Sequence, residues 1–173
     1  RKVLFLLKLY NEEEEKGFSL GASDYLVKPF LQEDLSNAIN RLNNDGKIHK
    51  ILVIDDDPED LRLVQKMLDQ NTGFEVQLAE GGTAGWEAIT TNPPDAIILD
   101  LFMPGMNGFA ILENLRSSTS LQNIPVIVLT GADLTADHLA QMNAFGQSML
   151  NKGILREKEL LNTLEQALRK IRF

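Results

Sequence analysis

The chain has 173 residues, of which 43% are hydrophobic and 24% charged, and its formal net charge is −8. An acidic balance excludes the clustered basic face that contacts to nucleic-acid phosphates need, so nucleic acid is not an expected partner. The absence of cysteine excludes disulfides and thiol chemistry, and no apolar run is long enough to span a bilayer, so we expect a cytoplasmic chain with no membrane contact through this segment.

The first 46 residues predict a strand, a helix, a second strand and a second helix. The first strand covers Val3 to Leu7, and a short acidic helix covers Glu12 to Leu20. After an apolar run that ends in Lys28, apolar residues at helical spacing predict a helix from Gln32 to Leu42. Turn-forming residues at 43–46 then predict a linker.

From residue 47 onward, strand and helix signals alternate, which is typical of a parallel sheet covered by helices on both faces. The predicted strands are Lys50 to Ile54, Glu75 to Ala79, Ala96 to Leu99, Val126 to Thr130 and about Ser148 to Asn151. The predicted helices are about Pro58 to Gln70, Thr83 to Thr91, Gly108 to Ser117, Thr135 to Phe145 and Arg156 to Ile171. Residues 1–46 repeat the pattern of residues 126–171, with Lys28 and Lys152 in matching places.

Two of the apolar runs end in aspartates. Ile51 to Ile54 is followed by Asp55 and Asp56, and the strand from Ala96 is followed by Asp100 and a loop rich in proline and glycine. Because neighbouring parallel strands end at the same edge of a sheet, we expect these carboxylates to share one site. A set of oxygen ligands without cysteine or histidine suits Mg²⁺. Asp57 is interpreted as a helix cap.

Four separated elements resemble, in order and spacing, the receiver domain of two-component response regulators. They are the run from Ile51 to Pro58, the loop from Asp100 to Gly108, the strand from Val126 to Gly131, and Lys152. The resemblance covers residues 47–173 and implies a flavodoxin-like α/β fold, a doubly wound five-stranded parallel sheet of order 2-1-3-4-5 with five helices. Residues 1–46 look like the C-terminal part of a preceding receiver, a β-α-β-α half-receiver, so the predicted domains are 1–46 and 47–173.

The resemblance also implies a role for each matching residue. Asp100 would accept a phosphoryl group from a phosphohistidine, while Thr130 and Lys152 would contact the phosphoryl oxygens. The implied ligands of Mg²⁺ are Asp55, Asp56, Asp100 and the backbone carbonyl of Phe102. The implied partner is a histidine kinase or a histidine phosphotransfer protein.

At three positions the chain differs from the usual family pattern. Asn107 stands where an aspartate is common, Met149 where an aromatic side chain usually switches, and Gly153 where a proline usually follows the lysine. Together with the half-receiver that precedes it, the domain is similar to the last receiver of a multi-receiver hybrid sensor kinase.

Three functions remain open from the sequence. The first is a phosphorylation-dependent switch that is not a turnover enzyme and only slowly dephosphorylates itself. The second is a pseudo-receiver that docks partners without phosphorylation, which the changes at Met149 and Gly153 leave open. The third is a phosphohydrolase in which Asp55 attacks and Asp57 serves as acid or base.

Residues 1–46 are too few to bury a core alone, so we expect them to pack on the rest of the chain or to exchange with a second copy in a homodimer.

Overall fold

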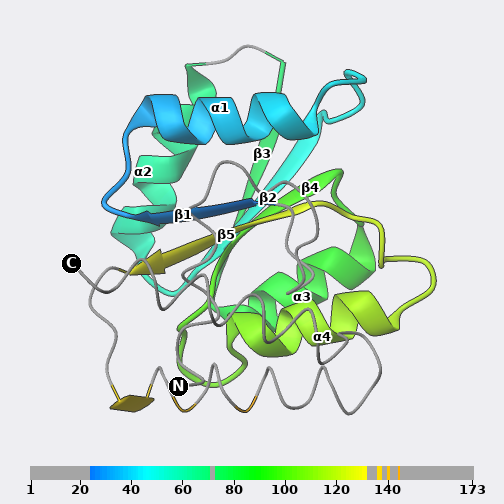
Figure 1. Cartoon of the computed structure of the whole chain (residues 1–173). Coiled ribbons are helices and arrows are strands. Elements are labelled where there is room, and N and C mark those ends of the chain that lie inside the picture. Colours follow the sequence, from blue (N-terminus) through cyan, green and yellow to red (C-terminus); the bar gives the residue numbers. More distant parts are fainter. Residues whose placement is uncertain (1–23, 71–72, 132–135, 138–139, 141–143, 145–173) are drawn as a thin grey trace, which may run out of the picture. The chain divides into compact units, whose positions relative to one another are not determined.

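The computed structural model describes residues 24–70 and 73–131, together with residues 136, 137, 140 and 144. Residues 22–131 form one compact unit, which contains a parallel sheet in the order β1-β5-β4-β2-β3 (Figure 1). The strands are β1 (Asp24–Lys28), β2 (Lys50–Asp55), β3 (Glu75–Glu80), β4 (Ala96–Asp100) and β5 (Val126–Gly131).

Helices cover both faces of this sheet. The described helices are α1 (Gln32–Leu42), α2 (Pro58–Asp69), α3 (Gly82–Thr91) and α4 (Gly108–Ser117). Helices α1 and α2 lie together on one face, and α3 and α4 lie together on the other (Figure 1). The alternating pattern of the sequence predicted this parallel sheet with helices on both faces, and it is the flavodoxin-like α/β arrangement that the resemblance implied.

Side chains at the helix starts explain where α2 and α4 begin. The Asp57 carboxylate accepts a hydrogen bond from the Glu59 backbone N–H at 2.9 Å, and Pro58 occupies the first turn, where a missing N–H costs nothing. Asn107 caps α4 by accepting from the Ala110 N–H at 3.0 Å. The predicted capping role of Asp57 is therefore confirmed, and an asparagine at position 107 serves the same purpose.

Most of the predicted elements within the described residues are confirmed. The four strands from β2 to β5 each extend one residue beyond the predicted end, and α1 and α4 have the predicted bounds. The predicted strands at Val3 to Leu7 and about Ser148 to Asn151, and the helices at Glu12 to Leu20 and Arg156 to Ile171, lie outside the described residues, and most of the helix from Thr135 to Phe145 does as well. The domain limits at 46 and 47 stay a prediction.

The strand beside β5 comes from the beginning of the chain. β1 pairs with β5 in parallel, from Asp24 opposite Ile127 to Lys28 opposite Gly131. The predicted order 2-1-3-4-5 assigned this position to residues near 148–151, so the structure differs from the prediction in the segment that it places there. The physical reason is apolar burial, because β1 and α1 contribute side chains to the same core as β2 and α2. Packing of residues 1–46 on the rest of the chain was one of the two expected solutions, and within the described residues β1 and α1 pack in this way.

The core is built around the two central strands. Every residue of β4 is buried, as are all residues of β2 after Lys50, which is why these strands appear in the sequence as continuous apolar runs. The side chains that β1 and α1 add to this core are Leu26, Leu35, Ala38 and Ile39.

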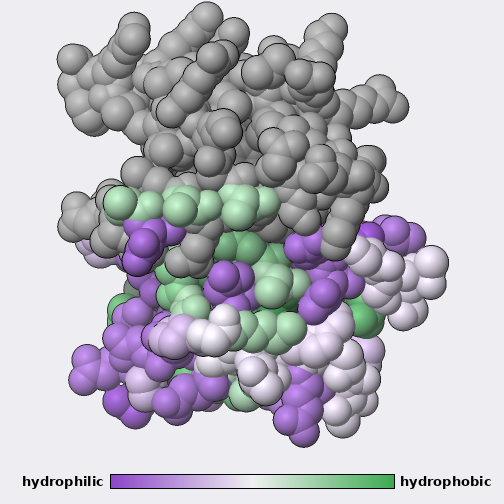
Figure 2. All heavy atoms as spheres, turned by 90° about the horizontal axis from the view of Figure 1, so that it is seen from below, coloured by the Kyte–Doolittle hydropathy of each residue, from purple (hydrophilic) through white to green (hydrophobic). Residues whose placement is uncertain are grey.

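On the face shown in Figure 2, hydrophilic residues surround a smaller group of hydrophobic ones within the described part of the chain. Among the described helices, none has the length and apolar character that a membrane crossing requires.

A glycine fixes the approach of α4 to the end of β4. A Cβ at Gly108 would lie 2.5 Å from the Asp100 carbonyl oxygen and 2.7 Å from the Leu101 Cα, and both are backbone atoms that cannot rotate away. The first turn of α4 therefore packs directly against the backbone of the strand end that carries Asp100.

Gly108→Ala should accordingly destabilise the protein by about 1–3 kcal/mol, because the added methyl group forces the backbone around Asp100 to shift. Urea unfolding followed by circular dichroism measures the change. Asn114→Ala, at an exposed position of the same helix, is the control and should change the free energy of unfolding by less than about 0.5 kcal/mol. Equal stability of the Gly108 variant and the control would contradict the close packing.

Candidate functional site

Three aspartates meet at the carboxyl edge of the sheet. Asp55 is the last residue of β2 and Asp100 the last residue of β4, and these strands are hydrogen-bonded neighbours in which Ile54 pairs with Leu99. One carboxylate oxygen from each of Asp55, Asp56 and Asp100 lies within 4.8 Å of the other two. We call these three residues the acidic cluster. Asp55 and Asp100 are buried, and Asp56 is exposed, so the cluster opens to solvent on one side.

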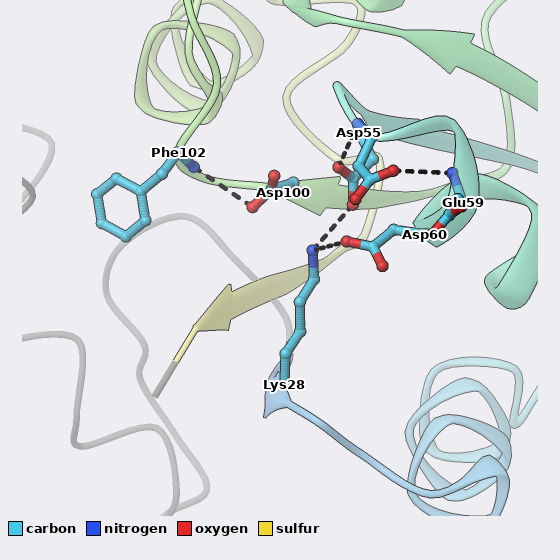
Figure 3. A network of polar contacts seen from close by, with 7 residues as sticks. Lys28, Asp55, Glu59, Asp60, Asp100 and Phe102 are labelled. Atoms are coloured by element: carbon cyan, nitrogen blue, oxygen red, sulfur yellow. Dashed lines mark hydrogen bonds and ion pairs between the residues drawn. The ribbon is translucent and has the colours of Figure 1, made fainter. Parts of the chain in front are cut away.

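Backbone amides orient two of the carboxylates. Asp55 Oδ1 accepts from the Asp57 N–H at 3.0 Å, and Asp100 Oδ1 accepts from the Phe102 N–H at 3.4 Å (Figure 3). These bonds arise because the chain turns sharply as it leaves each strand, which brings the amide two residues later back toward the carboxylate. Each amide holds one oxygen of its carboxylate, Oδ1, and leaves the second oxygen, Oδ2, to other partners.

Lys28 extends from the end of β1 into this site (Figure 3). Its Nζ donates to Asp55 Oδ2 at 3.0 Å and to Asp60 Oδ2 at 2.9 Å, and Asp60 lies in the first turn of α2. Burial acts to lower the pKa of Lys28, but the carboxylates of Asp100, Asp60 and Asp55 outweigh it and raise the pKa well above its usual value. The ammonium is therefore charged throughout the physiological pH range.

The carboxyl group of Asp100 binds a proton more tightly than the carboxyl group of an ordinary aspartate. Burial raises its pKa to about 7, and the nearby charges of Asp55 and Asp56 add to the effect. The Lys28 ammonium and the hydrogen bond from Phe102 oppose this rise without cancelling it. A cation that displaced the proton from Asp100 would relieve the repulsion among the three carboxylates.

The donor set fits a hard divalent cation. It consists of carboxylate oxygens, two of them buried and one exposed, and the cluster contains no sulfur or nitrogen ligand. Mg²⁺ is usually bound through one or two carboxylates and retains several waters, which the exposed side of the cluster permits. Asp55, Asp56 and Asp100 are thus the residues that would hold Mg²⁺. The role of the Phe102 carbonyl as a further ligand stays a prediction.

The structure places the other predicted site residues as follows. Leu129 pairs with Asp100, so Thr130, the next residue of β5, lies at the same edge of the sheet. Lys152 lies outside the described residues, and its role stays a prediction. Lys28 and Asp60 were not among the predicted site residues. The signal for Lys28 was its place in the internal repeat, where it matches Lys152, whereas nothing in the sequence distinguished Asp60 from other first-turn acids.

One protein family and several known proteins match the sequence of this chain. The family described as response regulator receiver domain matches residues 51–165. The response regulator MprA of Mycobacterium sp. (strain KMS) is 34% identical over 121 residues, which cover 70% of this chain and 51% of MprA. The protein RcaC of Microchaete diplosiphon is 31% identical over 156 residues, or 88% of this chain and 23% of RcaC. The chain thus spans about half the length of MprA and about a quarter of the length of RcaC.

A solved structure also resembles the chain. The N-terminal domain of a response regulator receiver protein from Methanoculleus marisnigri JR1 is 27% identical, with a TM-score of 0.47. The match covers 62% of this chain and 94% of that domain.

The raised pKa of Asp100 predicts a pH-dependent stability in the metal-free protein. Between about pH 4 and pH 7 the folded state binds a proton at Asp100 that the unfolded state has lost, so the free energy of unfolding should fall as the pH rises through this window. Asp100→Asn should flatten the fall and stabilise the protein at pH 8, by on the order of 2 kcal/mol. Urea unfolding in the presence of a chelator at pH 5, 6, 7 and 8 measures both profiles.

The control for this experiment is Asp95→Asn. Backbone hydrogen bonds from Lys50 and His49 lower the pKa of Asp95, so this substitution should destabilise the protein at neutral pH. Parallel profiles for the wild-type protein and the Asp100 variant would show that Asp100 does not titrate in this range.

Proposed function

Because the chain belongs to the response regulator receiver domain family of two-component signalling, we propose that it is a phosphorylation-dependent switch in which Asp100 accepts a phosphoryl group from a phosphohistidine. The observation that supports this proposal is the acidic cluster itself. Its three carboxylates converge at the ends of two adjacent strands, and a lysine ammonium reaches the same place. The donor in such a reaction is a histidine kinase or a histidine phosphotransfer protein.

The chemistry requires positive charge at this position. In the transfer, an oxygen of Asp100 forms a bond to phosphorus while the bond between phosphorus and the histidine nitrogen breaks, and the imidazole leaves and takes up a proton. The carboxylate and the phosphoryl group are both anionic, so they repel each other unless cations lie between them. When bound by the acidic cluster, Mg²⁺ supplies this neutralisation. The Lys28 ammonium, 3.0 Å from Asp55, contributes a permanent positive charge.

The same proposal assigns a stoichiometric reaction to the protein. One phosphoryl group is stored per chain as an acyl phosphate on Asp100 and is lost slowly to water, so the protein is not a turnover enzyme. A docking module without phosphorylation would bind partners with Asp100 unmodified, and a phosphohydrolase would release phosphate from small phosphoesters continuously. Incubation with acetyl phosphate and Mg²⁺, followed by intact-mass measurement, separates the three: a gain of one phosphoryl group that Asp100→Asn abolishes supports the switch.

Labelling should require the exposed member of the acidic cluster. Asp56→Ala is expected to abolish Mg²⁺-dependent labelling of Asp100, because it removes one of the three carboxylates that would hold the cation. Asp57→Ala is the matched control, since Asp57 is a neighbouring exposed acid that caps α2. It should cost about 1 kcal/mol of stability and leave labelling unchanged. Normal labelling of the Asp56 variant would contradict the assignment of the metal ligands.

The lifetime of the phosphorylated state should depend on Phe102. Its ring packs edge-on against the buried ring of Phe109, with centroids 5.5 Å apart, and it lies two residues after Asp100. An apolar side chain here offers no hydrogen bond to an attacking water. Phe102→Asn is therefore expected to speed the decay of the acyl phosphate by roughly one to two orders of magnitude, about 1.4–2.7 kcal/mol of barrier.

Decay is followed by intact mass after removal of the phosphodonor, with no kinase present. Phe102→Leu, which stays apolar, serves as the control and should keep the wild-type lifetime. An unchanged half-life in Phe102→Asn would rule out water exclusion by this side chain.

A further inference from the structure

The position beside β5 accepts only one strand. β5 pairs with β4 along one edge, where Asp100 is opposite Leu129, and with β1 along the other, where Lys28 is opposite Gly131. Both edges of β5 are therefore occupied. The segment that carries Lys152 has the matching sequence pattern, but it could pair with β5 in this sheet only by displacing β1. The two lysine-bearing segments are thus mutually exclusive at this position.

Apolar packing holds the segment from β1 to α1 in place. Leu26 of β1 and Leu35, Ala38 and Ile39 of α1 are each at most 7% exposed. They belong to the same core cluster as Leu61, Val64 and Leu68 of α2. Within the segment, Arg41 of α1 pairs with Asp24 of β1 at 2.6 Å, which links the end of the helix to the start of the strand. β1 and α1 therefore pack as one piece on β5 and α2.

The same segment delivers its lysine to the acidic cluster. Lys28 is the last residue of β1, at the edge where β2 and β4 end in Asp55 and Asp100. Its Nζ contacts Asp55 and Asp60 at 3.0 and 2.9 Å, and its side chain is 26% exposed (Figure 3). Asp60 is not a member of the cluster. Because it comes from α2, against which α1 packs, it fixes the ammonium between the helix start and the cluster.

We propose that residues 24–42 complete the receiver sheet of this chain, that Lys28 rather than Lys152 is the lysine of the phosphorylation site, and that Asp60 is the positioning residue for its ammonium. The role of Lys28 toward the phosphoryl group rests on the proposed function. The presence of Lys28 in the site of the unphosphorylated protein does not rest on the proposed function.

The two lysines provide matched variants for a test on the full chain. In the unphosphorylated protein, Lys28→Ala should tighten Mg²⁺ binding roughly threefold to tenfold, because it removes a cation that competes for Asp55. Lys152→Ala should leave the affinity unchanged, and Lys28→Arg should restore the wild-type value. Isothermal titration calorimetry with MgCl₂ measures all three. A tighter affinity in the Lys152 variant, or no change in Lys28→Ala, would overturn the proposal.

Labelling by acetyl phosphate then tests the role toward phosphate. Lys28→Ala should slow the labelling of Asp100 at least tenfold and Lys152→Ala by less than twofold, whereas the reverse order or equal effects would overturn the assignment of the lysine. Asp60→Asn should slow the labelling of Asp100 less than Lys28→Ala does. No labelling of the wild-type protein would instead contradict the proposed function, and the Mg²⁺ titrations would still decide which lysine occupies the site.

Hydrogen exchange tests the placement of β1 without any ligand. The amides of β1 that donate hydrogen bonds to β5 should exchange slowly in the native protein, and Leu26→Asp should expose them by disrupting the buried contact. Rapid exchange of these amides in the folded wild-type protein would overturn the proposal.

Discussion

The repulsion among three carboxylates at one edge of the sheet is the constraint on which the rest of the site depends. Asp55 and Asp100 are buried, and burial of a carboxylate is unfavourable unless a cation or hydrogen-bond donors compensate for the lost water. The structure provides backbone amides from Asp57 and Phe102 and the ammonium of Lys28. This compensation is incomplete, because Asp100 still has a pKa raised to about 7. The site therefore stays receptive to further positive charge.

The topology of the sheet produces this arrangement. Parallel strands that are buried on both faces end at a common edge, and the crossover helices bring the ends of β2 and β4 side by side although 44 residues of sequence lie between Asp55 and Asp100. The loop after β4 then turns against α4, whose first residue must be glycine because the helix meets the Asp100 carbonyl. A rigid frame of this kind holds the carboxylates together despite their repulsion.

The sequence predicted the part of the fold that depends on local pattern. Continuous apolar runs identified the central strands, and the aspartates at their ends identified the acidic cluster, because a charged residue directly after a buried strand can only lie at its edge. The partner of β5 could not be predicted in this way. The segments ending in Lys28 and Lys152 have similar patterns, so the choice between them depends on how well the whole unit packs, which no local signal records. The contact between Lys28 and Asp60 follows from that choice and was missed with it.

The apolar contacts that hold β1 in the sheet contribute more free energy than the ion pairs that its lysine forms. Full burial of an aliphatic side chain such as Leu26 or Leu35 contributes about 1.5–3 kcal/mol, so the apolar residues of β1 and α1 together outweigh any single ion pair. A partly exposed pair such as that of Lys28 and Asp60 contributes about 0–1 kcal/mol. The attachment of the segment therefore depends on packing, whereas the ammonium mainly sets the electrostatic balance of the acidic cluster. Because these two properties have different physical origins, a change of charge at Lys28 alters the site while β1 keeps its place beside β5.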